Sequence, residues 1–474
     1  MAIDVKARKR LVPAYPKKSR ALRVPFDILV CIFQVLEEDK RTLASCALVN
    51  WDANQAATTL LYRSIVFEPP YWYGYRQNDL EEKDSPLLQS ACLPRNARHV
   101  WHFEVKGYLS LRSSSSKNRS VLSQILSRAV KFFPNLQSVA LLPSSYYTEI
   151  FKGVLEVLSE HSKLRELSLD GSSINDGNLA ALMKIGGLRA LTIRDPPPAV
   201  VELFSEGWLE RSSGSITKLH LEGICTAIPS HVLCAQLANL KHVHTLSLGY
   251  TGAQSDLYLF PTLEHMPTLR SLSLQYDEES YGIPETHYQL HLESLTVRYF
   301  GPQTRADSDN LCDWILAIIS SSPLEELHLI DDNGEAINSD TGGEVKFHRL
   351  VQHLTMRHAL TLKVLQIPNG YLDADTVRNL YAKCIRLEEL AFATSWTVLL
   401  SVAPSTYHLH VLSVNLRVVD EVNDLPSLSS SEAAEIMKRM PSLRSLVVNQ
   451  SKWKGWWIRM NDSDRFVRIA QRIC

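Results

Sequence analysis

A short hydrophobic pattern recurs through most of the chain and limits its possible folds more than any other feature. The pattern is an apolar residue, two others, an apolar residue, one other and a third apolar residue. Twelve copies have first residues between 136 and 443, so the mean period is (443 − 136)/11, or about 28 residues. Such a period is typical of stacked repeats rather than of one compact core. A weaker copy at Val100, Phe103 and Val105 precedes the twelve. The twelve copies begin at Leu136, Leu164, Leu188, Ile216, Val243, Leu269, Leu292, Leu324, Leu362, Leu387, Leu409 and Leu443.

Each copy predicts a short strand, because its last two apolar residues lie two apart and share one face of an extended chain. The stretches between copies favour helices, as in Leu311, Ile315, Ile318 and Ile319, which repeat at helical spacing. The chain resembles leucine-rich-repeat proteins of the helix-bearing, ribonuclease-inhibitor-like kind. That resemblance implies an α/β solenoid, with parallel strands on the concave side and helices on the convex side. We expect about 12–13 repeats within residues 99–474.

The composition suits a globular protein inside the cell. Hydrophobic residues make up 45% of the 474 and charged residues 21%, which excludes wholesale disorder. The net charge of −1 gives no overall attraction to nucleic acid or to an anionic membrane, so neither is expected as a partner. No apolar run marks a secretory signal or reaches the roughly 18 residues of a membrane span. None of the eight cysteines belongs to a C-x-x-C pair, so we expect reduced thiols and a cytoplasmic or nuclear location.

The first 98 residues differ from the repeats. Residues 1–22 are rich in lysine and arginine, which fits a nuclear-import or phosphate-binding patch, although a solvated, disordered leader is the preferred interpretation. Residues 23–68 predict three helices. Pro25 opens the first, where its missing N–H costs nothing, and Asp39 precedes the second. The third follows from Trp51, and residues 69–98 form a connecting segment.

Residues 23–68 resemble the F-box, in the version common in fungal proteins. The matching runs are VPFDILVCIF, TLASCALVNW and NQAATTLLYRSI. The family usually carries a tryptophan where this chain has Ala53, and Trp51 lies two places earlier. An alternative is that the three helices only cap the open end of the solenoid, since terminal repeats need a cap.

The resemblance implies a set of partners. F-box segments bind the Skp adaptor, which links them to a cullin scaffold and its RING subunit, while the repeats hold a protein substrate. The chain is therefore predicted to be a substrate-receptor subunit of a Skp–cullin–F-box ubiquitin ligase that contributes proximity and no chemistry. The alternative is a leucine-rich-repeat scaffold whose F-box-like segment is not used for ubiquitination. The residues assigned to adaptor binding are Pro25, Ile28, Leu29, Ile32, Phe33, Leu43, Leu48, Val49 and Trp51.

No recognised catalytic or metal-binding motif occurs, so we expect neither an enzyme nor a cofactor or metal site. The nucleophile elbow, the zinc-protease helix motif and both glycine-rich phosphate loops are absent. Three histidine pairs have metal-compatible spacings, but no cysteine or carboxylate completes a ligand set. Trp453, Trp456 and Trp457 lie among basic residues, which fits nucleic-acid stacking or, more commonly, a cap at the end of a solenoid.

Three tyrosines occupy one equivalent position in consecutive repeats. Tyr250, Tyr276 and Tyr299 each lie seven residues beyond the first apolar residue of a copy. Equivalent positions of neighbouring repeats stack roughly 4.8 Å apart, so the rings predict a stripe at the strand ends. Tyrosine offers a large rigid face at small entropic cost, which makes the stripe a candidate substrate-binding site. Equally, the rings could pack together and shield the turns.

Overall fold

The structure is a computed structural model, and it describes most of the chain. The described residues are 24–68, 86–109, 116–144, 146, 148–252, 256–277, 287–301, 305–332, 347–402, 408–416, 428–449, 451–459 and 466–473. The basic leader at residues 1–22 and residues 69–85 of the connecting segment lie outside this set. None of the described helices is both long and apolar enough to cross a bilayer.

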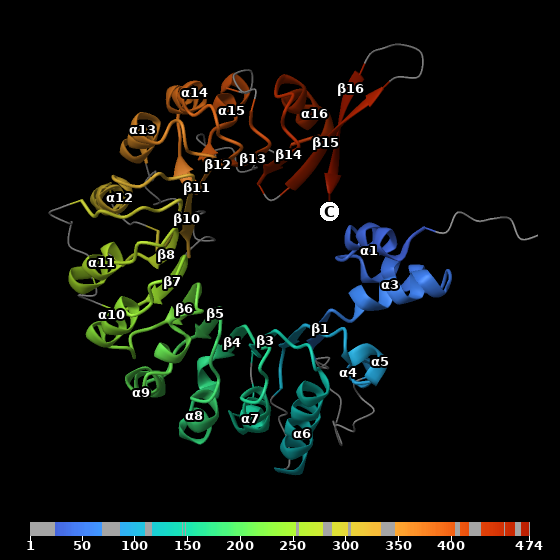
Figure 1. Cartoon of the computed structure of the whole chain (residues 1–474). Helices are drawn as coiled ribbons and strands as arrows, with labels where there is room; N and C mark the ends of the chain where they lie inside the picture. The colour runs from blue at the N-terminus through green and yellow to red at the C-terminus, as the bar shows by residue number, and fades with distance from the viewer. Residues whose placement is uncertain are drawn as a thin grey trace, which may run out of the picture.

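One sheet of sixteen strands runs through the described residues, and its strands follow one another in chain order. All pairings from β1 to β14 are parallel. The sheet bends into an open ring with strands inside and helices outside, as expected of a leucine-rich-repeat solenoid (Figure 1). The strands are β1 (Ser64–Phe67), β2 (His102–Val105), β3 (Ser138–Leu141), β4 (Glu166–Asp170), β5 (Ala190–Arg194), β6 (Lys218–Ile224), β7 (Thr245–Tyr250), β8 (Ser271–Gln275), β9 (Ser294–Tyr299), β10 (Glu326–Asp331), β11 (Val364–Tyr371), β12 (Glu389–Thr394), β13 (Val411–Leu416), β14 (Ser445–Val448), β15 (Ser451–Arg459) and β16 (Phe466–Ile473).

The hydrophobic pattern accounts for β2 to β14. All thirteen predicted copies, including the weak one at Val100, form strands of this sheet. Their three apolar residues are at most 3% exposed and belong to one continuous core beneath the sheet. Each repeat thus buries its apolar face against its neighbours, and the predicted α/β solenoid is confirmed.

Three further strands extend the sheet beyond the predicted repeats. β1 pairs with β2 and lies within the segment predicted to be helical. Tyr62, Ile65 and Phe67 follow the repeat spacing with an aromatic first residue, which is the signal that could have revealed β1. At the other end, β15 and β16 pair antiparallel and prolong the sheet past β14. Trp453 in β15 is 1% exposed, so this tryptophan serves as a cap on the core.

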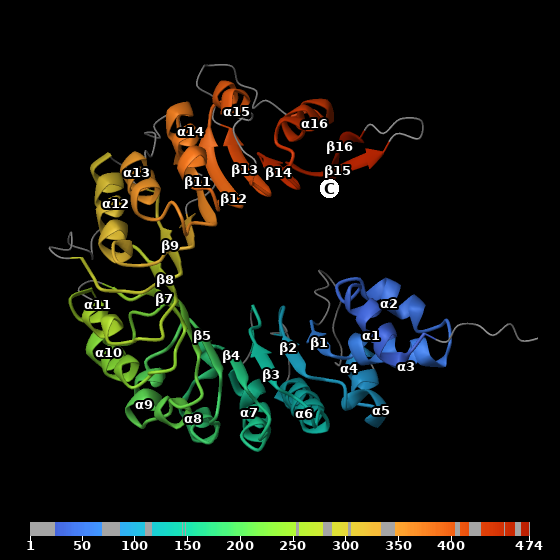
Figure 2. The same ribbon diagram turned by 45° about the horizontal axis from the view of Figure 1, so that its top comes forward.

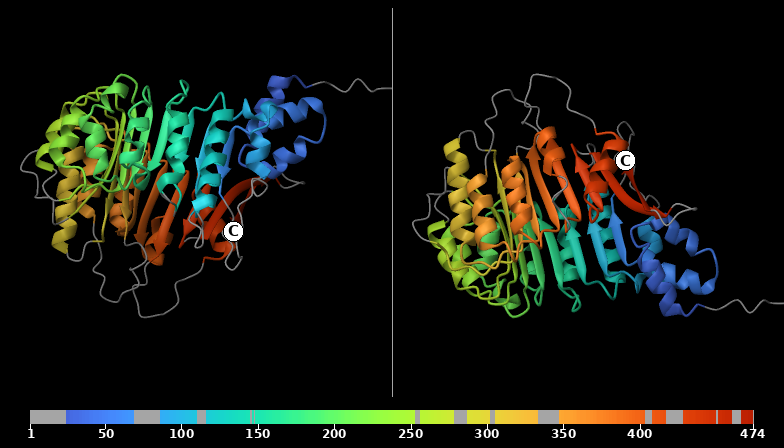
Figure 3. Two further views of the ribbon diagram at one scale, coloured as in Figure 1. Left: turned by 90° about the horizontal axis from the view of Figure 1, so that it is seen from below. Right: turned by 90° about the horizontal axis from the view of Figure 1, so that it is seen from above.

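Helices cover the outer side of the sheet, and the inner side is a continuous surface of strands (Figure 3). Several begin at a side-chain cap, such as Asp373 before α14, whose carboxylate accepts a 2.8 Å hydrogen bond from the Thr376 N–H. The α-helices are α1 (Phe26–Gln34), α2 (Lys40–Cys46), α3 (Trp51–Leu61), α4 (Pro86–Ala91), α5 (Pro94–Ala97), α6 (Ser116–Phe132), α7 (Lys152–Leu158), α8 (Asp176–Leu182), α9 (Ala199–Ser205), α10 (Ser230–Ala238), α11 (Asp256–Glu264), α12 (Arg305–Ile319), α13 (His348–Arg357), α14 (Ala374–Lys383), α15 (Trp396–Val402) and α16 (Ser430–Arg439). Short 3₁₀ turns occur at Thr148–Phe151, Gly171–Ser173 and Glu210–Ser212.

Helices α1 to α3 form a separate helical unit with its own small core. That core is separate from the core of the solenoid, and α1 and α2 both pack on α3. The helical unit lies beside β1 at one end of the ring, across the opening from β15 and β16 (Figure 2). The core residues are Phe33, Leu43, Ala53, Ala56, Ala57 and Leu60.

The helical unit joins the solenoid without a linker. Only Tyr62 and Arg63 separate the end of α3 from β1. The Arg63 carbonyl accepts hydrogen bonds from the backbone N–H groups of Trp101 and His102, at 2.9 and 3.0 Å. Its guanidinium lies 5.2 Å from the centre of a Trp101 ring and 3.8 Å from the Glu37 carboxylate, just after α1. Arg63 therefore ties the end of α1 to the first repeats.

Candidate functional site

An apolar stripe lies on the solvent side of α1. Ile28 and Ile32 are each 50% exposed, and Val35, one turn further on, is 85% exposed. Residues at this spacing share one helix face, so the stripe runs along the length of α1. Phe26 at the start of α1 is also exposed, at 47%. Soluble proteins rarely leave so much apolar surface on one short helix without a partner.

A second exposed apolar group lies at the turn between α2 and α3. Leu48, Val49 and Trp51 are 87%, 72% and 74% exposed. Asn50 fixes this turn by capping α3, because its side-chain oxygen accepts a 2.8 Å hydrogen bond from the Ala53 N–H. The Asn54 side chain also donates to the Ala47 carbonyl at 2.9 Å. The turn therefore presents its apolar side chains from a fixed backbone.

The structure divides the nine predicted adaptor-binding residues into buried, half-buried and exposed ones. Phe33 and Leu43 are 7% and 0% exposed and form the core of the helical unit, so assigning them to direct contact is wrong. Leu29 is half-buried against the same core. The physical reason is that α1 has two apolar faces, and α3 covers one of them. The six that remain exposed are Pro25, Ile28, Ile32, Leu48, Val49 and Trp51. Val24, Phe26 and Val35 are also exposed and apolar, although they were not among the predicted residues.

Ala53 does not weaken the third helix. It lies in the first turn of α3 and is 4% exposed within the core of the helical unit. Trp51 begins the same helix and points its ring to solvent instead of filling the core. The small side chain at 53 therefore suits the observed packing, and the tryptophan joins the exposed apolar group.

The tyrosines do not form an accessible stripe. Tyr276 is 6% exposed and its ring centre lies 5.3 Å from that of Trp314 on α12. Tyr299 is 1% exposed and lies 6.4 Å from Phe347, just before α13. Both follow the third apolar residue of their repeat by two positions, so they continue its buried face. The predicted substrate stripe is therefore wrong for these two, and Tyr250 is half-buried.

The concave face between β7 and β9 is small and polar. Six of its outward positions carry hydroxyl side chains, all half-buried, and the next outward positions are Gly249, Gln275 and the exposed Arg298. The six hydroxyl side chains stack in two registered rows across the three strands. The short side chains of these six positions let another chain approach the sheet closely. The rows are Thr245, Ser271 and Ser294, then Ser247, Ser273 and Thr296.

The described cysteines of the solenoid are packing residues. Burial raises the pKa of both Cys225 and Cys312 to about 12 and that of Cys384 to about 11. Such thiols carry no nucleophilic thiolate at neutral pH. Among the described residues, no group of three or more histidine, cysteine or acidic side chains could hold a metal ion.

Comparisons with known proteins find two solved structures of low similarity to this chain. No family model matches the sequence, and no curated protein does. Among solved structures, the Rad7 and Elc1 complex from yeast is similar, with 12% identity and a TM-score of 0.40 over 85% of this chain and 92% of that one. The TLR13–ssRNA13 complex is similar with 12% identity and a TM-score of 0.33, over 74% and 50%. At such values neither likeness supports a statement about function.

Proposed function

We propose that this protein is the substrate-receptor subunit of a Skp–cullin–F-box ubiquitin ligase. The helical unit docks the Skp adaptor, and the solenoid holds a target protein. The chain performs no chemistry itself and takes no cofactor. It raises the effective concentration of the target near the ubiquitin-charged enzyme.

The observation that carries the proposal is the exposed apolar surface of the helical unit. Ile28, Ile32, Leu48, Val49 and Trp51 are each at least half exposed, although they are large apolar side chains. Burying such side chains in a partner is favourable by roughly 1.5–3 kcal/mol apiece. A cap that only closed the solenoid would bury its apolar residues against the first repeat. With every described part of the chain in place these residues stay at least half exposed, which favours an adaptor over a cap.

The junction supports the same role. Because β1 follows α3 almost directly and Arg63 contacts both Glu37 and Trp101, the adaptor surface and the repeats have a defined relative geometry. A ligase subunit benefits from this arrangement, since the gain from proximity falls when two sites are joined by a long flexible linker.

Affinity capture of the full chain from cells with the proteasome blocked tests the proposal. The wild-type protein should bring down the Skp adaptor together with a cullin and a RING subunit. Replacing both Ile28 and Ile32 by serine should reduce adaptor recovery at least tenfold, because hot-spot residues at an interface are each worth about 2 kcal/mol. Leu360→Ser is a matched control, since Leu360 is 69% exposed on the solenoid.

The alternative function is a repeat scaffold that uses the same surface without ubiquitination. In this case, affinity capture should recover the adaptor without a cullin or a RING subunit. Equal adaptor recovery by the Ile28→Ser, Ile32→Ser variant and the wild type would rule out the adaptor surface in both cases.

A further inference from the structure

One ladder of side chains runs along the edge of the sheet where the strands begin. It is formed by the residue that follows the first apolar residue of each repeat, which we call the edge position. The backbone stacks these residues closely: the Arg165 carbonyl accepts hydrogen bonds from the N–H groups of Arg189 and Ala190, at 2.6 and 3.1 Å. Side chains at successive edge positions are therefore neighbours across adjacent strands, roughly 4.8 Å apart.

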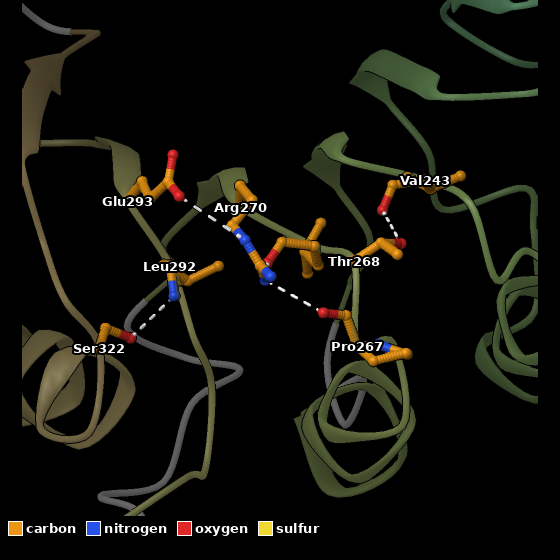
Figure 4. A network of polar contacts seen from close by, with 8 residues as sticks. Val243, Pro267, Thr268, Arg270, Leu292, Glu293 and Ser322 are labelled. Atoms are coloured by element: carbon orange, nitrogen blue, oxygen red, sulfur yellow. Dashed lines mark hydrogen bonds and ion pairs between the residues drawn. The ribbon is translucent and has the colours of Figure 1, made fainter.

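In the second half of the solenoid, two pairs of neighbouring edge positions carry opposite charges, and the two acidic members, Glu293 and Glu325, lie next to each other between them. Arg270 lies 3.6 Å from the Glu293 carboxylate on the next strand (Figure 4). Lys363 pairs with Glu325 in the same way. One repeat later, the His410 ring lies 3.8 Å from the Glu388 carboxylate. Cross-strand pairs of opposite charge stabilise a sheet, whereas like charges in these positions destabilise it.

Arg165 repeats the geometry of Arg270 without the carboxylate. Its guanidinium donates to the carbonyls of Ser162 and Leu164, at 3.1 and 2.9 Å. The guanidinium of Arg270 donates to the equivalent carbonyls of Pro267 and Leu269, at 3.0 and 2.9 Å (Figure 4). The next edge position after Arg270 is Glu293, but the next one after Arg165 is the exposed Arg189. Two arginines thus stand side by side in the arrangement that Arg270 and Glu293 fill with an ion pair.

More positive charge surrounds this arginine pair. Lys163 and Lys218 are exposed close by on the same edge, and Lys163 donates only to the neutral Asn135 side chain, at 2.6 Å. We call Lys163, Arg165, Arg189 and Lys218 the basic rim. Within the described residues, none of the four forms an ion pair with a carboxylate. The acidic Glu166 lies in the same row of the sheet as Lys218, two strands away with Ala190 between them.

We propose that the basic rim binds an acidic segment of a protein, whose carboxylates take the place that Glu293 occupies beside Arg270. That the acidic segment belongs to the target protein rests on the proposed function. Guanidinium groups suit the role because they bind carboxylates in a fixed, two-point geometry. Like charges on adjacent strands cost stability in the free protein, and an acidic ligand removes that cost.

The extent of the basic rim favours a short acidic peptide over nucleic acid. From β4 to β6 the rim spans two strand intervals, roughly 10 Å, which an extended peptide crosses in about three residues. Beyond Arg270 the edge turns acidic at Glu293 and Glu325, so a longer polyanion would meet repulsion. Single-stranded nucleic acid also needs aromatic side chains to stack on, and the four rim residues supply none.

The test uses the full chain with a fluorescent polyglutamate peptide in low-salt buffer. Arg189→Glu should weaken peptide binding about tenfold or more, because one cation is lost and an anion is added. This variant gives Arg165 the kind of neighbour that Arg270 already has, so its melting temperature should stay equal to or above wild type. Lys438→Glu on α16 changes the net charge by the same amount far from the rim, and it should bind the peptide normally.

Three outcomes would overturn the basic rim as a site for acidic peptides. They are equal peptide binding by wild type and Arg189→Glu, equal losses in Arg189→Glu and Lys438→Glu, and tighter binding of single-stranded RNA than of peptide. Adaptor capture is measured on the same samples. Its failure contradicts the proposed ligase role while leaving the peptide result interpretable, and Arg189→Glu should leave it unchanged.

Discussion

The helical unit and the solenoid are built from similar apolar residues but bury them differently. In the solenoid, the three apolar residues of each of the thirteen repeats are at most 3% exposed. In α1, Phe33 is the one buried residue of a helix whose other large side chains stay partly or largely exposed. A repeat always has neighbours to cover its apolar face, whereas a lone three-helix layer has none on its far side. Completeness of burial, rather than composition, therefore distinguishes the solenoid from the helical unit.

Two tryptophans, one in each region, give the largest expected contrast. Trp314 is 1% exposed, and its ring centre lies 5.3 Å from Tyr276 and 6.0 Å from Phe260. Trp314→Ala should lower the free energy of unfolding by roughly 3–5 kcal/mol, because it leaves a large cavity in the core. Trp51 is 74% exposed, so Trp51→Ala should change stability by less than about 0.5 kcal/mol. Urea unfolding of the two variants measures the difference.

For adaptor binding, we expect the opposite order, with the larger effect in Trp51→Ala and the smaller one in Trp314→Ala. Trp51→Ala should weaken capture by a factor of ten or more, corresponding to about 1.4 kcal/mol. Trp314→Ala, assayed where it remains folded, should bind the adaptor as the wild type does. A Trp51→Ala protein that unfolds as easily as Trp314→Ala would contradict the comparison.

The buried tyrosines should behave as members of the solenoid core. Tyr299→Ala is expected to cost roughly 3 kcal/mol of stability, because its ring is enclosed beside Phe347. The exposed Tyr258 on α11 is a matched control, and its replacement by alanine should be nearly neutral. Thermal unfolding distinguishes the two variants. An unchanged melting temperature for Tyr299→Ala would contradict a core role for this ring and make it a candidate contact residue again.

Adjacent residues of α1 allow the same comparison inside the helical unit. Phe33→Ala should destabilise the unit by roughly 2–3 kcal/mol, and it should weaken adaptor binding only through that loss. Ile32→Ala should leave α1 to α3 folded and weaken binding directly. Hydrogen exchange of α3 reports the stability of the unit, and capture reports binding. Equal protection of α3 in both variants would contradict the burial of Phe33.

The sequence predicted the solenoid well, because the spacing of its apolar residues shows directly which residues are buried. Each strand from β2 to β14 follows from three apolar residues at fixed intervals, and α3 begins at Trp51, where the third helix was expected. β1 was hidden by Tyr62 at a position usually held by an aliphatic residue. The β15–β16 pair was not predicted, because these strands pair antiparallel and the spacing of the parallel repeats contains no signal for such a pair.

The candidate sites were harder to predict, because spacing shows which residues share a face but not what covers that face. Ile32 and Phe33 are neighbours of similar polarity, and only the position of α3 separates them. Tyr276 has the correct parity for burial, since it follows Leu274 by two residues, and that signal was present in the sequence. The basic rim could not be predicted from the sequence, because it is recognised by comparing two repeats. Arg165 and Arg270 make the same backbone hydrogen bonds, and this shared geometry is known only from the structure.

Acid should destabilise the solenoid by less than the core substitutions do, and it should affect the two regions differently. His358, after α13, is 2% exposed; burial, together with the nearby charges of His353 and Arg357, lowers its pKa to about 4. Burial likewise lowers the pKa of His353. The helical unit contains no histidine, and hydrogen bonds from Thr42 hold the pKa of its Asp39 below the usual value of 3.8.

The sign follows from the direction of these shifts. A histidine whose pKa is lower in the folded state binds protons better when unfolded, so its stabilising contribution is complete above the unfolded value of about 6.5 and is lost as pH falls toward 4. Between pH 7 and pH 5 the loss for His358 is roughly 2 kcal/mol. The cap at Asp39 loses stability only when the pH falls below about 3.8, so α2 and α3 should be unaffected in that interval. Hydrogen exchange, corrected for intrinsic rates, should show α13 losing protection at pH 5 while α3 keeps it. If both helices lose protection in parallel, the helical unit and the solenoid unfold together. If a His358→Leu variant keeps the full acid sensitivity of α13, this histidine is not its cause.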